Sequence, residues 1–456
     1  MAVRVIFCTE LCRRNASLTI AYKGVDKRAD IRENEGEVPY FMSKGEHSLI
    51  VRKIKPEELK RTRELFAIAF ESPMDTAKTA KEVYEEAISA PASRYDFYWE
   101  ERWAAYEDDD RTMLSYFAAT PYPVHFDGHH CTMTGIGGVA SLPQYRRRGG
   151  IRSCFAAALP DMYEHGYAFS YLYPFSTAYY RKFGYEMCCE RTRYTIRLDA
   201  IRPFAVDGTC FLAEPGNVML DDIKYVYEKW QNNYNMMIVN EDYEYAWVMK
   251  SEPAKEQRFT YVYRNKDGIP KGFLSFCKVD ESSGRNLQCS HFFYTDMEGF
   301  KGLMNLVYSY SGDHRYITFE LPTDQTITTL LPEWSLGAGR SEHVFCGMVR
   351  VVNVVQVLQM AKFKGSGTLV LQIKDDFILQ NNDRFLVRFK DDVALEVTHT
   401  DLPADISLGI GDFSRLIVGI CDTETLLSMD SVVIHTDIEK ISKLFYRKPA
   451  LITEYF

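Results

Sequence analysis

The stretch that decides the fold is VASLPQYRRRGGIR, residues 139–152. An apolar run ends at Leu142, and a pattern of apolar residues at helical spacing begins after Gly149 and Gly150. The segment from 141 to 152 holds four arginines and no acid. Free N–H groups at a helix start attract anions, and arginine matches phosphate oxygens. The residues alone fit a solvated basic turn or a phosphate loop, and the strand–turn–helix order favours the loop.

The residues around this loop predict one mixed α/β domain over residues 48–200. A helical pattern at 56–70 begins with a proline and two glutamates, which suit the positive end of a helix. A second helical segment is expected over 75–103. Strands are expected at 48–54, 112–118, 131–142, 168–173 and 192–198. Residues 1–47 lack a long periodic pattern, and we expect a loosely attached, disordered extension there.

Two further domains are expected from the length of 456 residues, at about 150 residues per domain. Residues 201–345 predict a second α/β domain, with a helix at 220–234. Its strands are expected at 259–263, 272–279 and 316–321. Residues 346–456 show short alternating strands at 367–373, 385–389 and 393–397, followed by helical pieces.

Composition and charge exclude several classes of function. The net charge of −9 argues against nucleic acid as the main partner and is compatible with cationic small molecules. No apolar run reaches the ~18 residues of a membrane span. The eleven cysteines show no CxxC and no zinc-ligand spacing, so we expect reduced thiols, a cytoplasmic location and no metal.

The order of residues in 139–152 resembles the acyl-CoA loop of the GNAT acetyltransferases, Arg/Gln-x-x-Gly-x-Gly/Ala after the fourth strand. The last position is Ile151 here, which is typical of the Eis-type (enhanced intracellular survival) N-acetyltransferases. The resemblance runs from about residue 48 to the end. It implies an α/β (α+β) fold with two fused GNAT-like domains and a third domain similar to sterol carrier proteins.

The resemblance also implies an acetyl-CoA site in the first domain, with acetyl-CoA as co-substrate and no metal. The family's positions fall on Val139, Ala140 and Ser141 for the pantetheine arm, on Arg147, Arg148, Gly149, Gly150, Ile151 and Arg152 for the phosphates, and on Phe175 and Ser176 beside the cofactor. The middle domain lacks a phosphate loop, so one active site per chain is expected.

A second motif is YYRKFGY, residues 179–185, which follows the strand ending near Tyr173. The resemblance places the family's catalytic tyrosine at Tyr180 and not at Tyr179. A phenol of pKa about 10 is neutral at pH 7 and can donate a proton to a departing thiolate of pKa about 8.5. The alternative is a packed aromatic cluster, and the spacing behind the CoA loop favours the catalytic role.

The last residues, TEYF at 453–456, predict a terminus tucked into the protein, because exposed tails are normally polar. The resemblance implies that the α-carboxylate of Phe456 is the general base. A free α-carboxylate has a pKa of about 3.5, so this role requires desolvation or an intervening water. The alternative is an anchored terminus without chemistry.

The leading hypothesis is therefore direct acetyl transfer to the amine of a small molecule or peptide, such as an aminoglycoside, a polyamine or a lysine side chain. One alternative is a non-catalytic protein that binds CoA and carries an apolar ligand in its third domain. Another is a long-chain N-acyltransferase. The family's hexamers imply a homo-oligomer.

Overall fold

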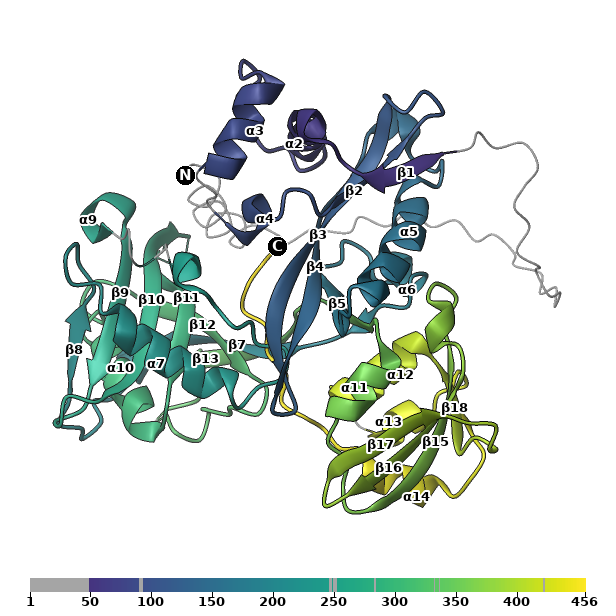
Figure 1. Cartoon of the computed structure of the whole chain (residues 1–456). Coiled ribbons are helices and arrows are strands. Elements are labelled where there is room, and N and C mark those ends of the chain that lie inside the picture. Colours follow the sequence, from purple (N-terminus) through teal and green to yellow (C-terminus); the bar gives the residue numbers. More distant parts are fainter. Residues whose placement is uncertain are drawn as a thin grey trace, which may run out of the picture.

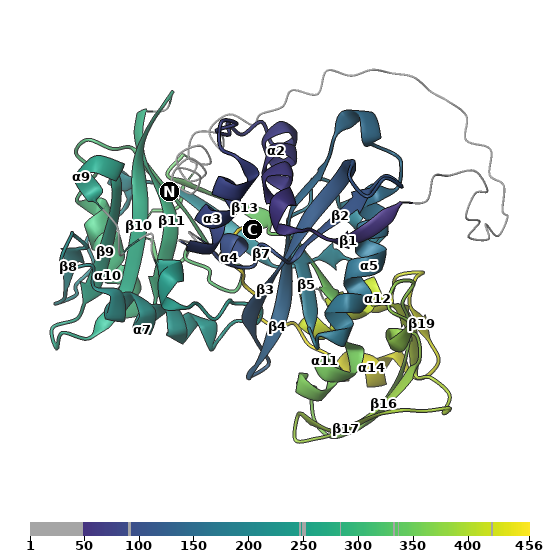
Figure 2. The same ribbon diagram turned by 45° about the horizontal axis from the view of Figure 1, so that its top comes forward.

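The computed structural model describes residues 49–89, 93–245, 248, 252–282, 284–331, 333–335, 337–420 and 423–456. The predicted extension at 1–47 lies outside the described residues. Figure 1 shows three groups of helices and strands, in blue, teal and yellow-green, that meet near the middle of the molecule, and Figure 2 shows them from another side. Each group is built on one sheet within the described residues.

The first sheet has seven strands in the order β1-β2-β3-β4-β5-β14-β6. Its strands are β1 (Ile50–Lys53), β2 (Arg102–Tyr106), β3 (Met113–Phe126), β4 (His129–Ser141), β5 (Phe169–Leu172), β14 (Met348–Val351) and β6 (Glu186–Met187). Its helices are α2 (Leu59–Ala69), α3 (Ala80–Ser89), α4 (Arg94–Phe97), α5 (Gly150–Glu164) and α6 (Thr177–Arg181). The expected helix over 75–103 was wrong at its end, because Trp103 lies in the buried strand β2.

Alternation along the strands gives this sheet two buried faces. Ala105 and Phe117 pack with the apolar side of α5, whereas Ala104 and Tyr116 pack with α2 and α3. The predicted helix after Gly149 is confirmed as α5, whose apolar side is buried because its residues recur at helical spacing.

The second sheet has the order β13-β7-β12-β11-β10-β9-β8. Its strands are β13 (Gly339–Phe345), β7 (Glu190–Arg197), β12 (Tyr316–Pro322), β11 (Gly284–Tyr294), β10 (Pro270–Glu281), β9 (Arg258–Arg264) and β8 (Thr209–Leu212). Its longer helices are α7 (Leu220–Gln231) and α10 (Met297–Tyr308), and α9 (Pro253–Glu256) is a single turn.

The two larger sheets exchange strands, which the sequence did not predict. Strand β7 was expected in the first domain, but it pairs with β12 and β13 of the second sheet. Strand β14 follows the second sheet along the chain and returns to the first, where it lies between β5 and β6. A period-2 pattern predicts a strand but not its neighbour, and this is why the expectation failed.

The third sheet has the order β17-β16-β15-β18-β19. Its strands are β17 (Val393–His399), β16 (Arg384–Lys390), β15 (Gly367–Lys374), β18 (Ile406–Gly409) and β19 (Val433–Ile434). Its helices are α11 (Val354–Met360), α12 (Ile410–Val418), α13 (Thr423–Leu427) and α14 (Ile438–Leu444). The three strands predicted between 367 and 397 are confirmed.

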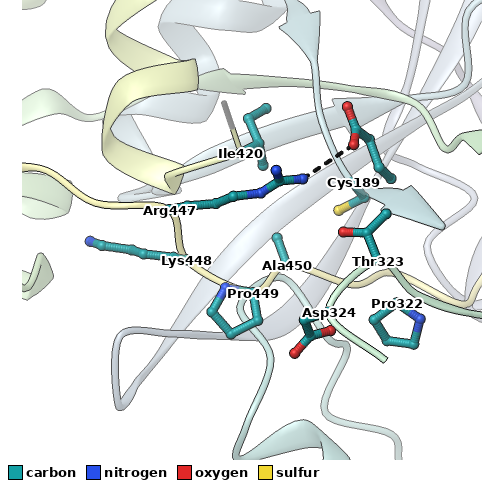
Figure 3. A pocket seen from close by; sticks show the side chains of 10 residues that line it. Cys189, Pro322, Thr323, Asp324, Ile420, Arg447, Lys448, Pro449 and Ala450 are labelled. Carbon is teal, nitrogen blue, oxygen red and sulfur yellow. Dashed lines mark hydrogen bonds and ion pairs between the residues drawn. The ribbon is translucent and has the colours of Figure 1, made fainter. Parts of the chain in front are cut away.

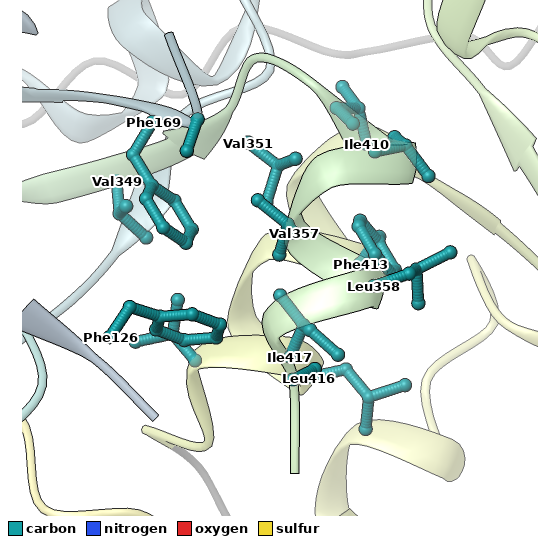
Figure 4. Close-up of a cluster of buried hydrophobic side chains, with 14 of the residues drawn as sticks. Phe126, Phe169, Val349, Val351, Val357, Leu358, Ile410, Phe413, Leu416 and Ile417 are labelled. Carbon is teal, nitrogen blue, oxygen red and sulfur yellow. The ribbon is translucent and has the colours of Figure 1, made fainter. Parts of the chain in front are cut away.

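One apolar core joins the third group to the first sheet. Figure 4 shows Phe126 and Phe169 of the first sheet facing Val357 of α11 and Phe413 and Ile417 of α12. All five side chains are buried, so the third group is packed onto the first sheet as a continuous core. None of the helices in the described part of the chain is long and apolar enough to cross a bilayer.

Candidate active site

The centre of the candidate site is the point where β4 and β5 separate. The two strands pair in parallel over only four residues, Met133–Ile136 with Phe169–Leu172. Beyond Ile136, no described strand pairs with this edge of β4. Gly138 has φ +61°, and the register between β3 and β4 shifts at this position, which marks a bulge. The backbone at Val139, Ala140 and Ser141 therefore borders an opening in the sheet.

The arginine-rich loop lies between this opening and α5. Arg147 has φ +66° and Gly149, the N-cap residue of α5, has φ +82°. No side chain caps the helix start, so the N–H groups of its first turn remain available to an anion. A Cβ at Gly150 would lie 2.6 Å from Ser115 Oγ, so the close packing of the helix against β3 requires glycine there.

The predicted phosphate-binding side chains differ in their surroundings. Arg147 and Arg152 are exposed, and the Arg152 guanidinium lies 5.7 Å from the ring centre of Phe377. Arg148 donates to both carboxylate oxygens of Glu107, at 2.7 and 3.0 Å. The Ile151 side chain is buried in the core, so only its backbone faces the loop. Arg147 and Arg152 are thus exposed at the loop, whereas Arg148 is held by Glu107.

Tyr180 lies in α6, the short helix that follows β5, and is 2% exposed. Its ring contacts an aromatic group formed by Phe155, Phe175, Tyr179, Phe183 and Tyr185. Burial raises the pKa of the Tyr180 phenol above its ordinary value, and the neighbouring phenols of Tyr179 and Tyr185 add to the shift. The phenol is therefore neutral at pH 7 and has a proton to donate.

Phe175 and Ser176 begin the same turn. Phe175 is 75% exposed and its ring centre lies 5.4 Å from that of Tyr180. Ser176 is the N-cap residue of α6 and accepts a hydrogen bond from the Tyr179 N–H at 3.4 Å. An exposed aromatic ring beside the candidate acid is free to contact a bound cofactor.

Phe456 lies against the middle of β4. Its ring centre is 5.1 Å from that of Tyr122 and 5.4 Å from that of Tyr173. A Cβ at Gly135 would lie 2.7 Å from the Phe456 ring, and a Cβ at Gly137 would lie 2.7 Å from the Phe456 carbonyl carbon. The prediction of a tucked terminus is confirmed by these contacts.

The glycine pair, Gly135 and Gly137, was missed at the level of sequence. Both residues are on the same face of β4, because they are two apart in a strand. Glycine within a strand often marks a close approach of another backbone, and the run Gly-Ile-Gly-Gly at 135–138 carried that signal. We call the space beside this face of Gly135 and Gly137, which Phe456 occupies, the glycine slot.

Tyr180 and Phe456 lie on opposite faces of the first sheet. Leu172 packs in the cluster that contains Tyr180, whereas its neighbour Tyr171 packs in the cluster that Phe456 contacts. Successive residues of a strand point to opposite faces, so these contacts assign Tyr180 and Phe456 to the two different faces of the sheet.

Glu454 lies close to the site, on the side of the second group. Its carboxylate accepts hydrogen bonds from Tyr227 Oη at 3.0 Å and from Thr453 Oγ1 at 2.9 Å. Burial raises its pKa above the ordinary value, and these hydrogen bonds offset only part of the shift. Tyr455 is 61% exposed and stacks on Tyr173 at 4.6 Å.

Comparisons with known proteins agree with this architecture. Models of the acetyltransferase (GNAT) domain match residues 50–188 and, separately, residues 237–351. A model of the sterol carrier protein domain matches residues 354–452. A search of curated proteins found no match.

Solved structures share the whole fold at low identity. A protein of Enterococcus faecalis described as a probable N-acyltransferase is 22% identical with a TM-score of 0.76, covering 90% of this chain and 100% of its own. A GCN5-related N-acetyltransferase of Anabaena variabilis is 17% identical with a TM-score of 0.75, covering 90% and 100%. Eis1 of Mycobacterium abscessus is 16% identical with a TM-score of 0.71, covering 89% and 100%.

The protein is an acyltransferase, since two of its domains match models of the acetyltransferase (GNAT) domain. More narrowly, it is a tandem GNAT protein with a C-terminal sterol carrier protein domain and the Eis-like fold. Within the described residues, no group of three or more His, Cys, Asp or Glu side chains is arranged to hold a metal ion.

Proposed function

We propose that the protein transfers the acetyl group of acetyl-CoA directly to the amine of a cationic substrate. GNAT domains generally use acetyl-CoA, and the first domain has the unpaired edge of β4 and the uncapped start of α5 that such a ligand needs. In this proposal the backbone of Val139, Ala140 and Ser141 pairs with the pantetheine arm, and Arg147 and Arg152 contact the phosphates.

The reaction is proposed to need two proton transfers. The amine loses a proton as its nitrogen attacks the thioester carbonyl, and the α-carboxylate of Phe456 accepts it directly or through water. The carbon–sulfur bond then breaks, and Tyr180 donates its proton to the CoA thiolate. The observation that carries the proposal is the main chain of Phe456 in the glycine slot beside the opening of the sheet.

A cationic acceptor fits the charge near this site. The exposed carboxylate of Glu241 adjoins Asn240, whose amide donates to Glu454 at 3.5 Å. Arg94 is paired with Glu244 at 2.8 Å and with Glu241 at 3.7 Å, so two carboxylates offset its single positive charge. The net charge of −9 acts in the same direction. The eight described cysteines are all free thiols, which is compatible with the proposed cytoplasmic location.

The test is release of free CoA thiol from acetyl-CoA in the presence of aminoglycosides, polyamines and lysine peptides. Amine-dependent release with acetyl-CoA, confirmed by the mass of the acetylated product, supports the proposal. Preference for myristoyl-CoA would instead identify a long-chain acyltransferase. Absence of CoA binding, together with an apolar molecule extracted from the protein, would identify a carrier of apolar ligands and contradict acetyl transfer.

A further inference from the structure

The C-terminal tail, defined as residues 448–456, runs from the third domain to the glycine slot and contacts all three domains on its way. Figure 1 shows it in yellow between the first and second sheets. It leaves the third domain at Lys448, whose N–H donates to the Gly419 carbonyl at 2.8 Å. The N–H of Asn235 then donates to the Pro449 carbonyl, and the Leu451 N–H donates to the Asn235 carbonyl, both at 2.9 Å.

Beyond Leu451 the tail is held by two more main-chain contacts. The Arg191 guanidinium donates to the Ile452 carbonyl. Tyr173 Oη donates to the Glu454 carbonyl at 2.6 Å. Contacts to main-chain groups are independent of side-chain identity, so they hold the tail without specifying which residue occupies which place. The register must be set by side chains.

Lys448 and Asp127 form a buried ion pair at the start of the tail. Their side chains are 3% and 5% exposed. Asp127 lies in the turn between β3 and β4 with φ +48°, at the end of the strand that carries the glycine slot. Its carboxylate also accepts from the Lys362 N–H at 2.8 Å and from Asn235 Nδ2 at 2.9 Å. One carboxylate therefore connects residues of the first, second and third domains to the tail.

Arg447, the residue before Lys448, forms an ion pair that is much more exposed. Arg447 and Lys448 both line a pocket of about 200 Å³, where the Arg447 guanidinium donates to the Glu190 carboxylate. Figure 3 shows the Arg447 and Lys448 side chains extending in opposite directions. The Arg447–Glu190 distance is 3.3 Å and the side chains are 57% and 28% exposed. Exposed pairs of this kind contribute little, whereas removing one partner of a buried pair leaves a charge without compensation.

We propose that Asp127 and Lys448 are positioning residues that fix the register of the tail, so that Phe456 rather than a neighbour occupies the glycine slot. This inference rests on the proposed function, in which the Phe456 carboxylate accepts a proton from the substrate amine. A slip of one residue would move the tail by about 3.3 Å and would turn alternate side chains to the other side. A Phe456 carboxylate displaced by that distance no longer reaches the opening between β4 and β5.

The test uses Lys448→Met, which keeps the aliphatic stem, and Asp127→Asn, which suits a left-handed backbone. Arg447→Met is the matched control. Carboxypeptidase A, which removes C-terminal aromatic residues, measures exposure of Phe456 in the full chain independently of catalysis. We expect Lys448→Met and Asp127→Asn to release Phe456 at least about tenfold faster than wild type and to lower kcat about tenfold or more, with the KM for acetyl-CoA nearly unchanged. Arg447→Met is expected to match wild type in both measurements.

If the single variants do not fold, the double variant Asp127→Asn/Lys448→Met serves instead, because it leaves no unpaired buried charge. Phe456 release at the wild-type rate in a folded variant that lacks the pair would overturn the positioning role. Faster release with an unchanged kcat would support the positioning role and overturn the proposed function of the carboxylate, so the two failures are distinguishable.

Discussion

At the scale of single residues, the glycine slot leaves no room for a larger side chain. A Cβ added to Gly137 would lie 2.7 Å from the Phe456 carbonyl carbon. We expect Gly137→Ala to displace the terminus and to lower kcat by about a hundredfold, the loss that a misplacement of about 1 Å produces. The control is Gly312→Ala, because a Cβ there meets nothing within 4 Å. Equal kcat values for the two variants would contradict the slot.

Tyr180 supplies a second prediction at this scale. Tyr180→Phe removes the hydroxyl group while the ring stays in its aromatic cluster. We therefore expect kcat to fall about a hundredfold with little change in acetyl-CoA affinity. Tyr179→Phe is the control, since its position in the same helix is similar. Because burial raises the pKa of Tyr180, wild-type kcat should show no loss from phenol ionisation up to about pH 10. Unchanged kcat in Tyr180→Phe would remove this residue from the mechanism.

Glu454 links pH to stability. Its pKa is raised in the folded state, so the folded state binds the proton more tightly than the unfolded state. Its contribution is favourable at low pH and is lost as pH rises through the raised pKa. Glu454→Gln is therefore expected to raise Tm at pH 8 and to change it little at pH 4. Thermal unfolding followed by circular dichroism measures both, and a lower Tm at pH 8 would contradict the assigned shift.

At the scale of elements, two neighbouring arginines of the loop before α5 are expected to differ in role. Arg147 is expected to affect acetyl-CoA binding, and Arg148 the stability of the fold. Arg147 is exposed, so Arg147→Ala is expected to raise the KM for acetyl-CoA about tenfold with kcat preserved, through loss of a phosphate contact. Arg148→Ala breaks the pair with Glu107 and is expected to lower Tm more than Arg147→Ala does. Steady-state kinetics and thermal unfolding distinguish the two, and an unchanged KM in Arg147→Ala would remove this residue from the phosphate site.

The elements also show what the sequence can and cannot predict. The basic loop, helix α5 and the three strands between 367 and 397 were predictable, because each depends on residues close together in the chain. The exchange of β7 and β14 was not, because those pairings join segments far apart in sequence. The glycine slot and Asp127 were missed for the same reason, since their partners belong to the last nine residues.

At the scale of the whole molecule, the third domain does more than extend the chain. Its helices share one core with the first sheet, and the tail starts from it. Under the proposed function, this packing holds the start of the tail that carries Phe456 to the candidate site. Homo-oligomerisation, and a hexamer in particular, stays a prediction from the family resemblance that light scattering can test.

The central claim is that the α-carboxylate of Phe456 takes part in acetyl transfer. It is tested most directly by adding two glycines after Phe456, which moves the carboxylate out of the slot while every side chain is kept. The account predicts that kcat falls about a hundredfold or more, with acetyl-CoA affinity and Tm close to wild type. Full turnover by the extended chain would contradict it.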